Sequence, residues 1–457
     1  MISHSLRSGA FSARPLSLAR IIGASIVVGG MFVSSVGVAQ DTVKPGGVLD
    51  PRRQHDAAPL TAEPRPQDDP TGVHDADRTI DAYQPKGIDL GEFLLLPAIE
   101  FGEALNTNVY AENRSAKADF ISSVAPEFRL QSRFDTHSLN FYGKAEQFMY
   151  HSFTRDNHLD GNLAADGRID VTKTAELGMF VNLFSRSEDR SSPDEAKGKT
   201  PTQTRGLNSR TSAKNTVGNF LYSVEVTADR NEFDNVTTTS GTVVQNRDRD
   251  RWEGAATGRV GYEIFPSYYA LMQYSENMHR YDNVPNSKGL NRDSEGYSAQ
   301  AGIGVDISQL IRGDFLVGYM EQNYKTGAFS NPSGVSFRSQ FNWTPDKLTL
   351  VVPALERSVK ETTTDLVGGM VETAASLLIR HELERNIILT ASGGVTFDQY
   401  EGIQKEAYTY DWRLKGTYVL VPEAYFSGEV AQKFKRSQIG SSDFDQTLVM
   451  MRLGLRL

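Results

Sequence analysis

One stretch decides the fold of this chain: Tyr297-Ser298-Ala299-Gln300-Ala301-Gly302-Ile303-Gly304-Val305-Asp306-Ile307. Every odd-numbered position is apolar, and every even-numbered position is polar or glycine. Because successive side chains of a β-strand point to opposite faces, this stretch forms a strand with one apolar and one polar face. As a helix it would spread its apolar residues around the cylinder, and each of its two glycines would cost about 1 kcal/mol.

The same unit repeats from Glu92 to Leu457, as about 15 alternating residues followed by a turn, with no intervening helix. About eighteen such repeats predict an all-β fold, a transmembrane antiparallel up-and-down β-barrel formed by one closed sheet. That architecture predicts a location in the outer membrane of a diderm bacterium. Outer-membrane lipid and the barrel-insertion machinery are the partners that it implies, and the apolar Leu457 closes an outward-facing stripe.

The composition excludes several classes of protein. The mean hydropathy of the 457 residues is negative, which excludes a polytopic helical membrane protein. The chain has no cysteine, so disulfides and thiolate metal sites are excluded. A net charge of −9 indicates no nucleic-acid partner. The histidines show no metal-ligand spacing, and no catalytic motif or cofactor-binding loop is present, so we expect neither an enzyme nor a cofactor.

Two segments precede the barrel. Residues 1–39 combine three arginines, an apolar run from Ile21 and small residues at the end, which predicts a cleaved signal peptide rather than a membrane anchor. Residues 40–88 are rich in proline and charge and have almost no large apolar side chains. They predict a disordered periplasmic extension, either a plain tether or a partner-binding segment. The barrel is expected over 89–457.

The turn pattern defines the strands. Their expected first residues are Glu92, Asp119, His137, Asn157, Thr174, Arg210, Tyr222, Arg249, Tyr268, Asp293, Asp314, Gly334, Lys347, Leu366, Asn386, Lys405, Glu423 and Asp443.

Short connections alternate with long ones, as in outer-membrane barrels whose termini lie in the periplasm. Tight turns are expected at Asp135-Thr136-His137, Phe265-Pro266-Ser267, Arg312-Gly313-Asp314, Thr344-Pro345-Asp346, Glu384-Arg385-Asn386 and Val421-Pro422-Glu423. Long polar loops are expected at Glu188 to Asn208, Asn235 to Asp248 and Asp282 to Arg292.

The cost of placing charge in lipid, roughly 2–4 kcal/mol near mid-membrane, fixes which face of each strand points inward. The predicted lumen-lining residues are Glu253, Arg259, Glu263, Asp411, Arg413, Lys415, Glu429, Lys433, Lys435, Arg452 and Arg456. An aromatic girdle at the periplasmic interface is predicted to include Tyr262, Trp343 and Tyr418.

A barrel of about eighteen strands is wide enough to enclose an aqueous channel. The cations of the last three strands have two interpretations. They attract anionic solutes, or they pair across the lumen with Glu225, Glu253, Glu263 or Asp306.

Two segments resemble the family called putative β-barrel porin type 2. The first runs from Gly91 to Glu100 and is followed by Asn106-Thr107-Asn108-Val109. The second runs from Asn342 to Leu350, with Arg357 and Glu361-Thr362 downstream. Members of this family are similar to barrels encoded near exopolysaccharide export genes. The resemblance therefore implies a passive route for a secreted polysaccharide, with export proteins in the periplasm as partners.

Three hypotheses follow. The first is a conduit for exopolysaccharide export. The second is a diffusion porin for small solutes, including anionic ones, in which the loop from Glu188 to Asn208 folds into the pore. The third is a surface or scaffold barrel that transports nothing.

Overall fold

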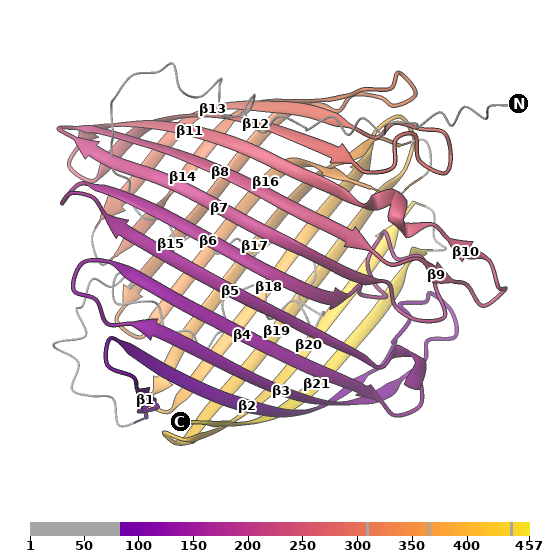
Figure 1. Ribbon diagram of the computed structural model, residues 1–457, viewed down its shortest axis with the longest axis horizontal. Coiled ribbons are helices and arrows are strands. Elements are labelled where there is room, and N and C mark those ends of the chain that lie inside the picture. Colours follow the sequence, from indigo (N-terminus) through magenta and orange to yellow (C-terminus); the bar gives the residue numbers. More distant parts are fainter. Residues whose placement is uncertain (1–82, 308–309, 363, 365–366, 439–441) are drawn as a thin grey trace, which may run out of the picture. The chain divides into compact units, whose positions relative to one another are not determined.

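The protein is described by a computed structural model that covers residues 83–307, 310–362, 364, 367–438 and 442–457. These residues form a closed antiparallel barrel with a wall of 18 strands, as the sequence predicts (Figure 1). The expected signal peptide and the extension as far as residue 82 lie outside the described residues. No helix in the described ranges is long and apolar enough to cross a membrane.

The wall strands follow one another around the barrel in chain order. The first seven are β2 (Phe93–Asn106), β3 (Asp119–Ser132), β4 (Ser138–Tyr150), β5 (His158–Asp170), β6 (Ala175–Ser187), β7 (Gln203–Val217) and β8 (Phe220–Phe233). The others are β11 (Arg251–Phe265), β12 (Tyr268–Tyr281), β13 (Ser294–Ile307), β14 (Ile311–Tyr324), β15 (Ser333–Asp346), β16 (Thr349–Glu361), β17 (Gly369–Glu384), β18 (Ile387–Tyr400), β19 (Glu406–Val421), β20 (Ala424–Ser437) and β21 (Phe444–Arg456).

The barrel closes where its first and last wall strands meet. β2 pairs with β3 along one side and with β21 along the other, in a register that runs from Ala98 opposite Arg456 to Asn106 opposite Leu448. Every wall strand therefore has two neighbours. Among the described residues, no strand of the wall is left with an open edge, as hydrocarbon requires.

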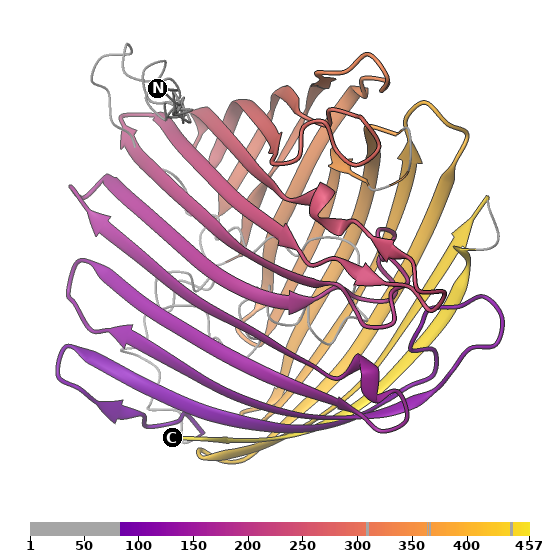
Figure 2. The same ribbon diagram turned by 45° about the vertical axis from the view of Figure 1, so that its right-hand side comes forward.

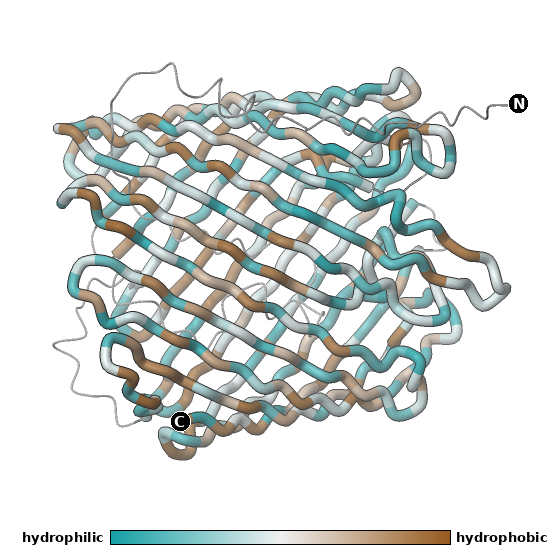
Figure 3. The backbone as a smooth tube through the Cα atoms, in the orientation of Figure 1, coloured by the Kyte–Doolittle hydropathy of each residue, from teal (hydrophilic) through white to brown (hydrophobic). Residues whose placement is uncertain are grey.

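The two faces of each strand differ in exposure, as β11 illustrates. Trp252, Val260 and Ile264 are exposed, whereas Glu253 and Arg259 on the other face are half-buried. Figure 3 shows the same alternation of apolar and polar residues along the strands. The apolar side chains cover the outside of the barrel, where they would contact lipid.

The segment directly before the barrel wall contacts the first wall strand. β1 (Ile88–Asp89) pairs with β2 at Leu94 and Leu95. Asp89 forms an ion pair of 2.6 Å with Arg133, in the connection that follows β3.

Long and short connections lie at opposite ends of the barrel (Figures 1 and 2). The short connections are turns such as 218–219 and 422–423. The longest connection, residues 234–250, contains the hairpin of β9 (Val236–Thr237) and β10 (Val243–Val244) and the 3-10 turn η4 (Asn246–Arg249). A second 3-10 turn, η3 (Thr154–Asp156), lies between β4 and β5. The predicted alternation is confirmed.

β7 begins at Gln203, not at the predicted Arg210, so the loop before it is residues 188–202. Gln203 to Asn208 pair with β6 as a regular ladder. The alternation of apolar and polar residues does not reveal the start of β7, because the outward positions of this strand are mostly small or polar. They are Leu207, Ser209, Thr211, Ala213 and Asn215.

Two predicted turns are also misplaced. Arg312, Gly313 and Asp314 lie within β14. Gly313 is required by close strand packing, because a Cβ there would lie 2.2 Å from the Gln340 carbonyl oxygen. Pro345 lies in the last residues of β15, at an irregularity of the β15–β16 ladder, where its missing N–H costs little. The turn itself is residues 347–348.

The exposed face of β11 generates a stability prediction. Val260→Arg places a charge on the outer surface and should lower the free energy of unfolding in lipid vesicles by about 2–4 kcal/mol. Thr257→Arg, on the inner face of the same strand, is the control and should have a much smaller effect. Denaturant titration of both variants measures the difference. Equal losses would contradict the assignment of the two faces.

Candidate functional site

The connection between β6 and β7, residues 188–202, crosses the barrel interior, and we call it the inner loop. The Lys433 ammonium on the inner face of β20 donates a hydrogen bond of 2.8 Å to the Ser191 hydroxyl. Thr362 donates one of 3.3 Å to Asp194 Oδ1. Thr362 directly follows β16, which lies almost opposite β6 and β7 in the barrel order. Lys433 lies four residues before the last residue of β20. The contact with the inner loop is therefore about 13 Å from that end of the strand.

Arg190, a residue of the inner loop, stabilises the conformation of the loop through its hydrogen bonds. Its guanidinium donates to Asp156 Oδ1 through Nε at 2.9 Å and Nη2 at 2.7 Å. Nη1 donates to Glu195 Oε1 at 2.6 Å and to the Gly198 carbonyl at 2.9 Å. Burial disfavours the charge on Arg190, but Asp156 and Glu195 outweigh this effect and raise the pKa of Arg190. The side chain therefore stays cationic and keeps the loop closed on itself.

Tyr110, in the connection after β2, joins the same cluster. Its hydroxyl donates to Asp156 Oδ2 at 2.9 Å, and its ring lies 5.4 Å from the Arg190 guanidinium. Burial and the neighbouring carboxylate of Asp156 raise the pKa of Tyr110 to about 12, so this hydroxyl remains a donor.

The inner loop is also fixed to the connection between β8 and β11. Arg249 donates to both carboxylate oxygens of Glu188, at 3.0 and 2.7 Å. Asn246 Nδ2 donates to the Thr202 hydroxyl at 2.9 Å, and the Lys199 amide donates to the Thr237 carbonyl at 2.8 Å. These contacts tie both ends of the inner loop to the β8–β11 connection.

The predicted charged residues of the last three strands alternate with exposed apolar side chains such as Trp412 and Leu414. Lys415 and Arg456 are half-buried. The other six are buried: Asp411, Arg413, Glu429, Lys433, Lys435 and Arg452.

Several of these cations pair with carboxylates on nearby strands. Arg413 Nε lies 3.0 Å from Glu429 Oε1. Arg452 contacts Glu100 at 3.2 Å and Glu146 at 2.8 Å. Lys144 shares these two carboxylates, at 3.0 Å from Glu100 and 3.9 Å from Glu146. The resulting network joins β2, β4 and β21 across the closure of the barrel.

The carboxylates that the sequence suggested as partners pair elsewhere, so that part of the prediction is wrong. Glu225 lies 3.6 Å from Arg210, Glu253 lies 2.7 Å from Arg251, and Asp306 lies 2.9 Å from Arg312. Glu263 accepts a hydrogen bond from the Ser267 amide at 3.0 Å. These arginine partners lie on the same strand or on the next one, where side chains are close enough to meet directly, whereas the cations of β19 to β21 lie much farther around the barrel.

Arg259, which the sequence also placed in the lumen, is half-buried on the inner face of β11. It forms an ion pair of 2.6 Å with Asp314 on β14 and donates to Gln273 of β12.

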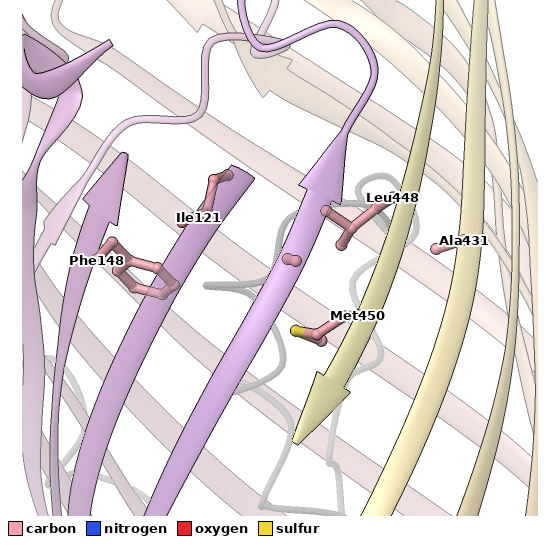
Figure 4. Close-up of a cluster of buried hydrophobic side chains, with 6 residues drawn as sticks. Ile121, Phe148, Ala431, Leu448 and Met450 are labelled. Carbon is pink, nitrogen blue, oxygen red and sulfur yellow. The ribbon is translucent and has the colours of Figure 1, made fainter. Parts of the chain in front are cut away.

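An apolar cluster also lies on the inner wall (Figure 4). Each member is at most 7% exposed. The cluster lies two residues from Lys433 along β20, next to the contact with the inner loop. Its members are Ala104, Ile121, Phe148, Ala431, Leu448 and Met450.

A row of amide side chains crosses the adjoining part of the inner wall, from β5 to β8. Asn162 Nδ2 donates to Asn182 Oδ1, and Asn182 donates to Asn208 Oδ1, both at 3.4 Å. Asn208 donates to Asp229 at 3.0 Å. The residues are half-buried, so this wall offers donors and acceptors to water or to a solute.

Glu361, the last residue of β16, fixes the far anchor of the inner loop. It accepts hydrogen bonds from the hydroxyls of Tyr281 at 2.7 Å and Tyr324 at 3.1 Å. Arg292 donates to the carbonyls of Thr362 and of the residues before β17. The connection that receives Asp194 is thus itself held in place.

The three predicted girdle aromatics are exposed and lie toward the short-turn ends of their strands. Tyr262 is in β11, Trp343 in β15 and Tyr418 in β19. Tyr262 packs edge-on against Phe220 of β8, with ring centroids 5.0 Å apart.

Sequence reasoning missed Glu100, Glu146, Arg190 and Asp194. Glu100 and Glu146 carried a usable signal, because a charged residue well inside a wall strand is costly on the lipid face. The two loop residues have no periodicity that reveals their position. Among the described residues, no group of three His, Cys, Asp or Glu side chains is arranged to hold a metal ion.

Comparison with solved structures finds other outer-membrane proteins. OpdK from Pseudomonas aeruginosa is 12% identical, with 79% of this chain and 99% of that chain covered and a TM-score of 0.40. A BenF-like porin from Pseudomonas fluorescens is 8% identical, with the same coverage and TM-score. OccAB3 from Acinetobacter baumannii is 9% identical, with 80% and 100% covered and a TM-score of 0.39. No curated protein matches the chain.

The family comparison is decisive. The model of the family described as "Putative beta-barrel porin 2" matches residues 81–457, which include every strand of the barrel. Family and fold favour a channel over an enzyme. The chain belongs to this porin family and is a β-barrel of the outer membrane.

Proposed function

We propose that this barrel is a diffusion channel for small water-soluble solutes and that the inner loop narrows it. The observation that carries the proposal is the course of residues 188–202. They contact Lys433 on one wall and Thr362 on another, and they are anchored at both ends. A barrel of this strand number has an aqueous interior, and a loop fixed across it reduces the open cross-section.

The same loop argues against the exopolysaccharide route that the family resemblance implies. A polymer chain occupies the whole length of the channel at once and needs a wide opening throughout. A small solute can pass through a narrower gap beside the loop. No contact in the described part of the chain specifically favours a polymer. A barrel serving only as a surface scaffold gains no support either, since it would not need a loop held inside its wall.

The buried ion pairs of Arg190 should decide whether the loop stays in place. Arg190→Met removes the contacts to Asp156 and Glu195 and leaves buried carboxylates without their partner, at a cost of about 3–5 kcal/mol. Amide hydrogen exchange over residues 188–202 should therefore become much faster. The matched control is Arg205→Met, because the Arg205–Asp234 pair is exposed and contributes at most about 1 kcal/mol.

Identical exchange in the two variants would contradict the role of Arg190 as the anchor of the loop.

Replacing residues 190–200 with a short Gly-Ser linker should widen the channel. Single-channel conductance in planar bilayers should rise, and liposome swelling should show faster entry of larger sugars. The control is the same replacement at residues 239–241, in the exposed turn of the β9–β10 hairpin. Unchanged conductance and an unchanged size limit in the inner-loop variant would refute the proposal.

The amount of secreted polysaccharide distinguishes a diffusion channel for small solutes from a route for polysaccharide export. On the present proposal, deletion of the gene leaves the amount of secreted polysaccharide unchanged and slows uptake of small solutes. Loss of secreted polysaccharide in the deletion strain, restored by the intact gene, would favour the export route instead.

A further inference from the structure

A group of lysines lies on the inner wall where the inner loop arrives. Lys433 and Lys435 are adjacent inward positions of β20, and each is at most 8% exposed. Lys405, directly before β19, places its ammonium 3.9 Å from the centroid of the Tyr400 ring and 3.3 Å from the Thr364 hydroxyl. Three ammonium groups are thus gathered at the tip of the loop.

Among the described residues, two wall carboxylates lie in this region. Asp411 lies directly opposite Lys433 in the β19–β20 ladder. Asp398, on β18, is 4% exposed, and its charge interacts with those of Lys405 and Lys435. In the described part of the chain, no carboxylate oxygen lies within 4.0 Å of the Lys435 ammonium. In the described part of the wall, the three lysines therefore outnumber these two carboxylates by one.

The third carboxylate comes from the inner loop. Asp194 receives a hydrogen bond from Thr362 and acts electrostatically on Lys405 and Lys435. Burial lowers the pKa of Lys405, and the carboxylates of Asp194 and Asp398 oppose that decrease. With Asp194 in place, three cations face three anions.

We infer that Lys405, Lys433 and Lys435 form an anion-binding site that Asp194 occupies in this structure. A small permeating anion of the carboxylate, phosphate or sulfate class displaces Asp194 and takes its place. This inference rests on the proposed channel function and adds a solute class to it. Displacement exchanges one counter-ion for another, so the basic wall is never left uncompensated, and buried charge without a partner is strongly unfavourable.

Ion selectivity in planar bilayers tests the site. With a KCl gradient across the intact barrel, the reversal potential should have the sign of a channel that prefers chloride. Lys435→Gln should lower the ratio of chloride to potassium permeability by about threefold, and Asp194→Asn should raise it by about the same factor. Lys214→Gln is the control, because Lys214 lies on the inner face of β7 and pairs with Glu176 far from this site. It should leave the ratio unchanged.

Equal or absent shifts in the Lys435 and Asp194 variants would overturn the inference. An Asp194→Asn variant with a higher conductance but an unchanged permeability ratio would also overturn it. Asp194 would then hold the loop in place without acting as a counter-ion.

Calorimetric titration with inorganic phosphate in detergent separates the site from the channel. Phosphate should bind the intact barrel, about threefold more weakly to Lys435→Gln and about threefold more tightly to Asp194→Asn. If phosphate binds with these relative affinities but the barrel does not conduct ions, the anion-binding site is supported and the channel function is refuted. If the barrel conducts ions but phosphate binding does not differ in this way, the channel function is supported and the anion-binding site is refuted.

Discussion

The structure depends on the pairing of its first wall strand with its last. A strand in hydrocarbon has no water to satisfy its backbone, so every N–H and C=O must find a partner within the sheet. The β2–β21 ladder provides the final set of these bonds. A charged network crosses the same closure, since Arg452 on β21 contacts Glu100 on β2 and Glu146 on β4. Side-chain pairing thus reinforces the backbone ladder where the first and last wall strands meet.

Closure divides the molecule into an outside and an inside with different chemistry. The outside carries apolar side chains that alternate with the inward residues of the same strands. The inside is varied: a charged wall lies on the last strands, an apolar cluster lies beside it, and amides cover β5 to β8. The inner loop joins these regions, because it leaves the amide side and reaches both Lys433 and Thr362. The part of the interior that the inner loop reaches is therefore lined by residues of several chemical types.

The alternating pattern predicted the strands because lipid penalises a charge on the wrong face of a strand. The stretch from Tyr297 to Ile307 follows this rule throughout and falls within β13 as expected. The rule weakens in β7, whose outward positions include Ser209, Thr211 and Asn215, and there the predicted start is seven residues late. Pro345 and Gly313 were assigned to turns because these residue types favour turns. In the structure, Gly313 lies where two strands pack closely, and Pro345 lies at an irregularity of the β15–β16 ladder.

The interior was harder to predict than the wall. The sequence indicates that Arg413 and Arg452 point inward, but the choice of partner depends on register and on the distance across the barrel. Loop residues such as Arg190 and Asp194 obey no period, so only the three-dimensional course of the chain brings them to Tyr110, Asp156 and Thr362. The prediction that this loop enters the pore came from its length and polarity alone.

The meeting of β2 and β21 also has a consequence for biosynthesis. The sheet closes only when β21 pairs with both β20 and β2, so a chain truncated within β21 leaves the edges of these two strands with unpaired backbone groups. Such edges invite association with other chains and attack by proteases. Quality control in the periplasm can therefore recognise an incomplete molecule by its open sheet, without reading any particular sequence.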